Sequence, residues 1–415
     1  MTGGTQEADA GWSRRRFVGA LGAALAAGGT LSGCSGDGGE GSPASPATPD
    51  GSTGPSRRAG ASAPAPSATS RSPSRRPLYL GTYTSAEGGG RGIGTASYDP
   101  VSGRITGGAT VAGVADPSYL AVHQDGRTLY AVNERERGTV TAVRTADRKV
   151  LGSSATGGTF PCHLSVHPGG RWLLSADYGS GSVAVHRIGA SGALGDRTDT
   201  VTHRRPAPGP GQDGPHAHQF VTAPDGGHLL AVDLGTDTVY SYRLDERSGT
   251  LREVAQAHAR PGAGPRHLVF HPGGRYAYLA NENDDTVTVC AYDPATGRLT
   301  IGAPLSTGSG EGTNYPAQLV VAPDGRHAYL ANRGANTLAR YAVEAAGARL
   351  RLLGTVPVAG DFPRHLALAP GGRLLFTANQ RSSTVSVFHV DPSSGGLRLA
   401  GEPFASPVAV CALPL

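Results

Sequence analysis

The sequence lacks several features that would define a function class by themselves. Its 415 residues include four cysteines, one methionine and two tryptophans, and charged residues make up 17% of the total. No Gly-x-Ser-x-Gly elbow, Walker loop or dinucleotide fingerprint stands in a strand-to-helix context. The sequence therefore does not support assignment as a serine hydrolase, a nucleoside triphosphatase or a Rossmann-type enzyme.

Cysteine is so rare that at most one disulfide can form in the folded part of the chain. If Cys34 is lipid-modified, as argued below, then Cys162, Cys290 and Cys411 remain, an odd number for an oxidising compartment. Each of the three lies in a strand-like stretch. We therefore predict that all three behave as small buried hydrophobes.

Residues 78–415 also have no large excess of positive or negative charge. The formal net charge is +5, but residues 1–77 hold eight arginines and five acidic residues, which leaves 29 basic and 27 acidic residues in 78–415. A difference of two charges provides no basic stripe that would bind nucleic acid. We predict no nucleic-acid partner.

What the sequence does contain is an eighteen-residue phrase that returns six times. The copies open at Pro117, Pro161, Ala217, Pro265, Pro316 and Pro363, at intervals of 44, 56, 48, 51 and 47 residues. A glycine stands nine places after each opening residue, and an asparagine or aspartate stands sixteen places after it. A repeat of this length, built from short β-rich phrases, is typical of a β-propeller in which each repeat forms one four-stranded blade.

Each phrase is predicted to be a β-hairpin, because the residues between its two apolar stretches are Asp-Gly or Gly-Gly, which suit a tight turn with positive φ. A third strand follows in every copy, and segments such as 250–254 and 396–400 supply a fourth. Residues 407–411 look like the opening strand of a seventh phrase, and 78–83 look like its second strand. We therefore predict an all-β fold over residues 78–415, a seven-bladed β-propeller closed by N- and C-terminal strands sharing one blade, which leaves no free sheet edge.

The residues before the propeller have a different composition. Arg14 and Arg15 form a twin-arginine signature, an uncharged apolar run follows, and residues 31–34 resemble a lipobox that ends in Cys34. We predict a twin-arginine lipoprotein signal peptide over 1–34 and a disordered Ser/Pro/Ala/Gly-rich linker over 35–77. The apolar run is too short to span a bilayer. The protein is thus expected to be exported and lipid-anchored to the outer face of the cytoplasmic membrane, with no other membrane contact.

Two positions of each phrase vary while the scaffold repeats, and they are expected to meet at one rim of the central channel. They follow the opening residue by one and by seventeen places, and their polar members gather in neighbouring blades as His218, Arg266, Glu282, Arg333 and Arg364. Three guanidiniums, an imidazole and a carboxylate at one channel mouth suit an anionic, oxygen-rich small molecule. Further candidates for substrate contacts are Glu134, His216 and Gln380.

Other roles stay open for these residues. Arg266 and Glu282 could form only a cross-strand ion pair, Arg364 could cap loop carbonyls, and His218 could be a core histidine. The histidines that precede the hairpin turns are interpreted as structural residues at the opposite rim: His123, His167 and His271.

A metal site is a further alternative, because His216 and His218 occupy alternate residues of one strand. A third ligand would have to come from Glu282 or Asp213, and no motif-like spacing indicates either. We predict no metal and no cofactor.

Several motifs together resemble those of the lactonase family of seven-bladed propellers, which includes the propeller type of 6-phosphogluconolactonase and the fungal carboxy-muconate lactonising enzymes. The motifs are Leu-Gly-Thr-Tyr-Thr at 80–84, Gly-Pro-His-Ala-His at 214–218, Gly-Pro-Arg-His-Leu at 264–268, Ala-Asn-Glu at 280–282 and Ala-Asn-Arg-Gly at 331–334. The resemblance covers essentially all of residues 78–415.

The resemblance implies a catalytic histidine at His218, a site arginine and glutamate at Arg266 and Glu282, and a further arginine at Arg333. We accordingly expect a monomer that hydrolyses a small anionic or polyhydroxylated, sugar-derived lactone. The expected export signal would separate it from the phosphorylated intermediate inside the cell, so the substrate itself is left open. A non-enzymatic, lipid-tethered binding propeller and a muconate-type lactonising cyclase remain alternatives.

Overall fold

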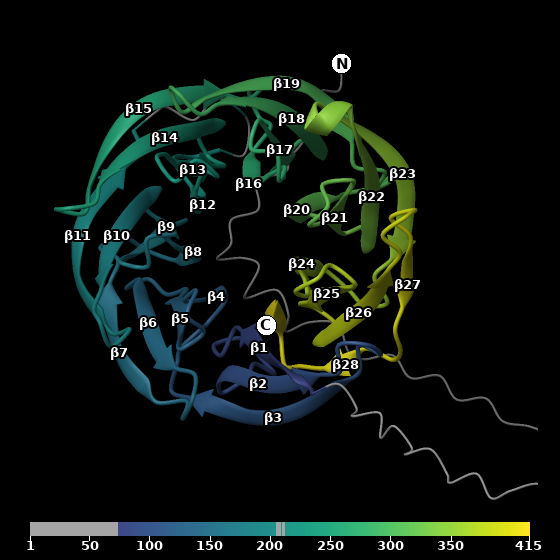
Figure 1. The fold of residues 1–415 in the computed structure, drawn as a ribbon, viewed down its shortest axis with the longest axis horizontal. Helices are drawn as coiled ribbons and strands as arrows, with labels where there is room; N and C mark the ends of the chain where they lie inside the picture. The colour runs from purple at the N-terminus through teal and green to yellow at the C-terminus, as the bar shows by residue number, and fades with distance from the viewer. Residues whose placement is uncertain (1–73, 205–208, 210–211) are drawn as a thin grey trace, which may run out of the picture. The chain divides into compact units, whose positions relative to one another are not determined.

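The fold is an all-β propeller, as expected from the repeat. The computed structural model describes residues 74–204, 209 and 212–415. Its strands form seven sheets, arranged in a ring with the first strand of each sheet nearest the centre (Figure 1). The predicted signal peptide, with Cys34, and almost all of the predicted linker lie outside the described residues.

The first three blades share the same four-stranded antiparallel order. Blade 1 contains β29 (Ala409–Pro414), β1 (Arg76–Thr82), β2 (Gly92–Tyr98) and β3 (Ile105–Ala112); blade 2 contains β4 (Leu120–Val122), β5 (Thr128–Asn133), β6 (Thr139–Arg144) and β7 (Val150–Ala155); blade 3 contains β8 (Pro161–Val166), β9 (Trp172–Asp177), β10 (Ser182–Ile188) and β11 (Leu194–Thr202).

The next two blades repeat this order. Blade 4 contains β12 (Ala217–Thr222), β13 (Leu229–Asp233), β14 (Thr238–Asp245) and β15 (Thr250–His258); blade 5 contains β16 (Pro265–Phe270), β17 (Tyr276–Asn281), β18 (Thr286–Asp293) and β19 (Arg298–Ser306).

The last two blades differ only in detail. Blade 6 contains β20 (Tyr315–Val321), β21 (His327–Arg333), β22 (Thr337–Glu344), the 3₁₀ helix η2 (Ala345–Gly347) and β23 (Arg349–Pro357); blade 7 contains β24 (Pro363–Leu368), β25 (Leu374–Asn379), β26 (Thr384–Val390), β27 (Leu397–Leu399) and β28 (Phe404–Ala405). Its outer strand is split, since β27 and β28 both pair with β26.

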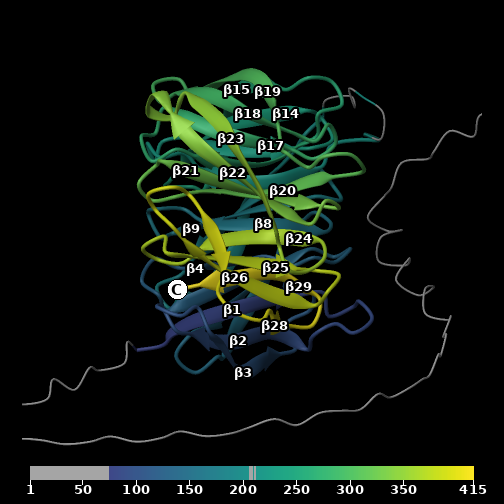
Figure 2. The same cartoon turned by 90° about the vertical axis from the view of Figure 1, so that its right-hand side faces the viewer.

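Blade 1 closes the ring with strands from both ends of the chain. Strand β29 pairs antiparallel with β1, with Leu78 opposite Pro414 and Gly81 opposite Cys411. The backbone N–H of Leu415 also donates to the carbonyl of Pro77 at 3.0 Å. The prediction of a blade shared by the two termini is therefore confirmed, and Figure 2 shows β29 beside β1 in the side view.

The hairpin turns adopt the predicted conformation. The glycines nine places after the opening residues all have φ near +70°: Gly126 (72°), Gly170 (70°), Gly226 (69°), Gly274 (72°), Gly325 (72°) and Gly372 (70°). Left-handed backbone of this kind favours glycine, which explains why the residue recurs at this place in the phrase.

Hydrophobic cores form between successive blades rather than at the centre of the ring. One cluster joins Tyr278 and Val287 of blade 5 to Leu319, Leu330 and Tyr341 of blade 6. Each sheet thus buries both faces against its neighbours, and the channel edge remains available for polar residues.

The rim that holds the hairpin turns is tied together by histidines, as predicted. The Nε2 atom of His123 lies 3.0 Å from the carbonyl of Gly170 in the next blade, and that of His271 lies 3.2 Å from the carbonyl of Gly325. These side chains connect turns of adjacent blades at the rim opposite the variable positions.

The cysteines match the prediction of small buried hydrophobes. Cys162, Cys290 and Cys411 are all buried, and no disulfide joins any two of them. Burial raises the pKa of the Cys290 and Cys411 thiols to about 12. No helix within the described part of the chain is long and apolar enough to cross a bilayer.

Candidate active site

In several blades a β-bulge makes the first variable residue an extra residue of the inner strand. In blade 5, Pro265 pairs with Asn281 but His267 pairs with Ala280, so Arg266 is the extra residue of the inner strand. The same skip occurs at Cys162, His218 and Arg364. A bulge bends its strand and redirects the extra side chain, which explains why these positions can vary without disturbing the ladder.

The two variable positions of a blade do meet at one rim. Ser118 donates its hydroxyl to Oε2 of Glu134 at 2.5 Å, and Nε of Arg266 lies 2.9 Å from Oε2 of Glu282. Both pairs join the residue one place after the opening residue to the residue seventeen places after it. The contact expected from the symmetry of the hairpin is therefore confirmed.

A second guanidinium reaches the same carboxylate oxygen from the neighbouring blade. Nη2 of Arg333 lies 2.5 Å from Oε2 of Glu282. The side chains of Arg266 and Arg333 are 3% and 5% exposed, whereas that of Glu282 is 21% exposed. Two nearly buried cations and one carboxylate leave this part of the mouth with a surplus positive charge.

Arg333 is held on its other sides as well. Its Nε donates to the carbonyl of Tyr315 at 3.1 Å, and its guanidinium lies 5.4 Å from the ring centroid of Phe362. A guanidinium fixed by a carboxylate, a carbonyl and an aromatic face is preorganised, so a ligand that it binds need not order it first.

Arg364 lies in a second polar group at the mouth. Its guanidinium stands 5.7 Å from the ring centroid of Tyr83, whose hydroxyl donates to Oε2 of Glu134 at 2.9 Å. Gln380, in the same blade as Arg364, has an Oε1 atom that is buried and has no hydrogen-bond partner among the described residues. Buried amide oxygens are normally satisfied, so a ligand hydroxyl would suit this atom.

His218 is 1% exposed and packs between aromatic side chains. The edge of the Tyr178 ring meets it at a centroid distance of 5.8 Å, and the ring of His267 lies 5.6 Å away. The aromatic contacts restrict the orientation of this imidazole. Its catalytic role, implied by the resemblance, stays a prediction.

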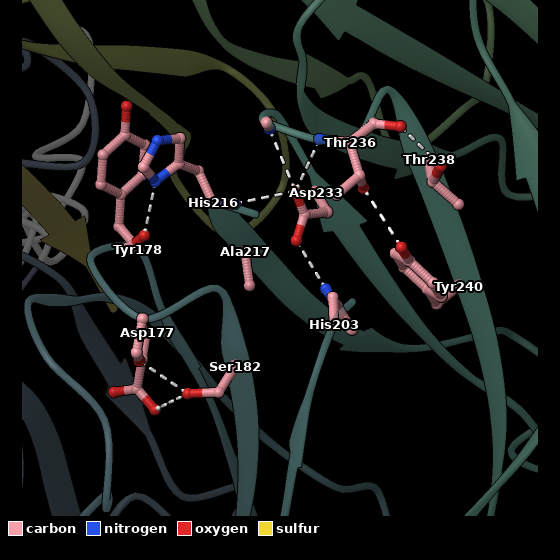
Figure 3. A network of polar contacts seen from close by, with 12 residues as sticks. Asp177, Tyr178, Ser182, His203, His216, Ala217, Asp233, Thr236, Thr238 and Tyr240 are labelled. Carbon is pink, nitrogen blue, oxygen red and sulfur yellow. Dashed lines mark hydrogen bonds and ion pairs between the residues drawn. The ribbon is translucent and has the colours of Figure 1, made fainter. Parts of the chain in front are cut away.

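His216 has partners on both ring nitrogens. Nδ1 lies 2.9 Å from the carbonyl of Tyr178, and the ring stacks on Tyr178 at 4.4 Å (Figure 3). Nε2 lies 2.9 Å from Oδ1 of Asp213. Substrate binding by His216 stays a prediction. Across residues 74–204, 209 and 212–415, no group of three His, Cys, Asp or Glu side chains is arranged to hold a metal ion, so the metal alternative finds no support in this part of the chain.

Below the mouth, the residues two places after the opening residues form a layer that sequence reasoning missed. Tyr119 packs on His163 at 4.4 Å and on His365 at 5.4 Å, and His163 packs on His267 at 5.5 Å. Burial lowers the pKa of His163 and His365 to about 3, which keeps these imidazoles neutral. The signal was the Pro-x-His-Leu sequence that occurs at 161–164, 265–268 and 363–366.

Comparison with known proteins gives consistent matches. Residues 77–414 match the family model described as Lactonase, 7-bladed beta-propeller. A 6-phosphogluconolactonase of Bacillus subtilis (strain 168) is 30% identical over 291 residues, covering 68% of this chain and 82% of that protein.

Two solved structures match with similar quality. A periplasmic gluconolactonase of Pseudomonas aeruginosa superposes with a TM-score of 0.77 and 32% identity, covering 82% of this chain and 99% of the other. A protein from Lactobacillus plantarum superposes with a TM-score of 0.77 and 33% identity, covering 82% of this chain and all of the other.

Proposed function

The chain belongs to the lactonase family of seven-bladed β-propellers, and on that premise we propose that it opens a lactone ring by hydrolysis at the channel mouth. It is 6-phosphogluconolactonase-like by its relatives. The observation that carries the proposal is the placement of two nearly buried guanidiniums, Arg266 and Arg333, on one carboxylate oxygen of Glu282. Such a site retains positive charge where an ester carbonyl would develop an oxyanion.

His218 is the general base in this proposal. Glu282 is less suited, because two guanidiniums on one oxygen favour its charged form and oppose proton uptake. The imidazole of His218 takes a proton from water as the water oxygen bonds to the lactone carbonyl carbon. It then returns that proton to the ring oxygen as the carbon–oxygen bond breaks, so that lactone and water yield a hydroxy acid.

Arg266 stabilises the tetrahedral oxyanion, and the remaining polar groups hold the substrate. Arg333 and Arg364 suit a carboxylate, phosphate or hydroxyl-rich tail. Glu134 and Gln380 suit its hydroxyl groups, since both present oxygen acceptors at the same rim. A general base contributes about 10² to 10⁴-fold, which is enough for lactones because they open readily in water.

The proposed substrate is a sugar-derived lactone met outside the cytosol by a monomeric, lipid-anchored protein. Support comes from the twin-arginine and lipobox sequence ending in Cys34, and from the similarity to a protein described as a periplasmic gluconolactonase. An unphosphorylated aldonolactone fits this location better than a phosphorylated intermediate of the cytosol.

The proposal is tested with purified residues 74–415 and a panel of glucono-δ-lactone, 6-phosphogluconolactone and unsubstituted δ-valerolactone. Proton release is followed with a pH indicator, and the spontaneous rate is subtracted. We expect His218→Asn, Arg266→Ala and Glu282→Gln each to lower kcat/KM by about 100-fold or more. Arg333→Ala should mainly raise KM, because a group that binds the tail acts on ground and transition states alike.

His271→Asn is the matched control, since that imidazole contacts the carbonyl of Gly325 at the opposite rim. It should leave kcat/KM unchanged. A wild-type protein that accelerates none of the lactones would contradict hydrolysis and favour a binding module. Full activity in folded His218→Asn would contradict the assignment of the base.

A further inference from the structure

Two aromatic side chains from neighbouring blades meet beside the proposed catalytic histidine, His218. Tyr178 follows β9 of blade 3, while His216 and His218 stand at the beginning of blade 4. The His216 and Tyr178 rings are stacked, with centroids 4.4 Å apart and planes at 10°, and the Tyr178 ring meets His218 at 83°. Tyr178 thus contacts one imidazole with its face and the other in a T-shaped arrangement.

Both ring nitrogens of His216 face oxygen atoms. The carbonyl of Tyr178, 2.9 Å from Nδ1, can only accept, so Nδ1 donates this hydrogen bond to blade 3. Nε2 lies 2.9 Å from Oδ1 of Asp213, whose side chain is 85% exposed. The hydrogen bond to the carbonyl and the ring stacking therefore both attach the His216 side chain to Tyr178.

The backbone of His216 is fixed from the other side by buried groups of blade 4. Its N–H donates to Oδ1 of Asp233 at 2.9 Å, and the same oxygen accepts the N–H groups of Gly235 and Thr236, each at 3.0 Å (Figure 3). Oδ2 of Asp233 lies 2.6 Å from Nδ1 of His203. His216 is therefore anchored in blade 4 while its side chain reaches blade 3.

We propose that His216 is a positioning residue, which holds Tyr178 against His218 and so fixes the orientation of that imidazole for proton transfer. This inference rests on the proposed function of His218. Misplacing a reacting group by about 1 Å can cost about 100-fold in rate, so a clamp of this kind matters for kcat.

The experiment measures how the His216 and Tyr178 side chains affect turnover. We expect His216→Gln to lower kcat about tenfold with little change in KM, whereas a residue that binds substrate would mainly raise KM. Tyr178→Ala should reproduce this loss, and Tyr178→Phe should retain activity because it keeps the ring and the carbonyl. Thermal melting of each variant checks that the propeller is folded.

His123 supplies the matched control. Its Nδ1 lies 2.8 Å from Oδ1 of Asp125 and its Nε2 lies 3.0 Å from a carbonyl, so it also lies between a carboxylate and a carbonyl, with the two ring nitrogens exchanged relative to His216 and at the opposite rim. His123→Gln should leave kcat unchanged. If the wild-type protein opens lactones and His216→Gln behaves like His123→Gln, the positioning role is wrong while the proposed function stands. If the wild-type protein opens no lactone, the proposed function fails and the positioning role fails with it.

Discussion

Arg333 pairs with Glu282 across the boundary between two blades. Arg333 ends β21 of blade 6, Glu282 follows β17 of blade 5, and their closest atoms are 2.5 Å apart. The proposed activity and the packing of blade 5 against blade 6 thus depend on the same contact. A change at Glu282 should therefore affect both activity and stability.

Glu282→Gln leaves Arg266 and Arg333 nearly buried without an anionic partner. Beyond its loss of activity, we expect the free energy of unfolding to fall by about 1 to 3 kcal/mol, measured by urea denaturation. Glu344 is the matched control, because its carboxylate also pairs with two arginines, Arg349 and Arg351, each at 2.7 Å, but those guanidinium side chains are mostly exposed. Glu344→Gln should lower the free energy of unfolding less than Glu282→Gln does, because solvent screens the exposed pairs. Equal losses of stability in Glu282→Gln and Glu344→Gln would show that burial of the two arginines does not increase the contribution of Glu282.

Asp177 should make the propeller less stable as the pH rises. Burial raises the pKa of this carboxyl from 3.8 to about 7, so the folded state holds the proton more tightly than the unfolded state does. The stabilisation is complete below about pH 4 and is lost progressively between pH 4 and pH 7, by up to about 4 kcal/mol. Asp177→Asn should remove this loss, since asparagine stands at the same position of four other blades. Urea denaturation should show that Asp177→Asn raises the free energy of unfolding more at pH 8 than at pH 5.

Asp233 provides the contrast for that measurement. It occupies the same position in blade 4, but its two oxygens accept three backbone N–H groups and contact His203. Asp233→Asn should therefore lower stability at both pH values. If Asp177→Asn and Asp233→Asn both raised the free energy of unfolding, burial of the carboxyl group would decide the effect, and the hydrogen-bond donors around Asp233 would not.

The thiols of the folded protein should be unreactive. Cys162, Cys290 and Cys411 are buried and form no disulfide with one another, and burial raises the pKa of the Cys290 and Cys411 thiols to about 12. Residues 74–415 should titrate close to no thiol with a disulfide reagent in native buffer, and three after unfolding. Rapid reaction of one thiol in the native protein would place it at a surface, contrary to the structure.

Removal of residues 407–415 should open the ring. These residues include β29, the innermost strand of blade 1, and without it β1 presents an unpaired edge at the channel. We expect insoluble or protease-sensitive protein, assessed by expression yield and limited proteolysis. A soluble, cooperatively unfolding truncation would contradict the role of the shared blade.

Cys34→Ala should change where the protein is found. If the lipobox is processed, the native protein fractionates with the membrane, and the variant is released or stays unprocessed. Immunoblots of membrane and soluble fractions distinguish these outcomes. Native protein found wholly in the cytosol would rule out the expected export and would restore a phosphorylated lactone as the substrate.

Short sequence patterns predicted the blades because the contacts that form a blade join residues close together in the sequence. The glycine of each turn has left-handed backbone, and the asparagine that stands sixteen places after four of the opening residues bonds hydroxyls of the third strand. Asn281, for example, donates to the hydroxyls of Thr286 and Thr288 at 2.9 and 3.0 Å. Both requirements lie within about twenty residues of sequence, so they recur visibly from copy to copy.

The site was predictable only in part, because its geometry depends on contacts between blades. Spacing placed Arg266 beside Glu282, but it did not reveal the bulge that redirects Arg266. Nothing in the sequence separates Asp177 from Asp233, which differ because His203 reaches only the second of them. The stacking of His216 on Tyr178 likewise depends on how blades 3 and 4 pack.

The ends of the propeller are hydrogen-bonded neighbours, since Leu415 donates to Pro77 at 3.0 Å. They lie at the rim away from the mouth, because β1 runs from Arg76 to Thr82 and the next residue, Tyr83, contacts Glu134. The ring therefore has no structural starting point. A short peptide joining the ends, with a new break at the hairpin turn of another blade, would give a circular permutant with the same seven sheets and an undisturbed mouth. In such a chain the added peptide would connect β29 directly to β1, so the two strands that now come from opposite ends of the propeller would be covalently continuous within their own blade.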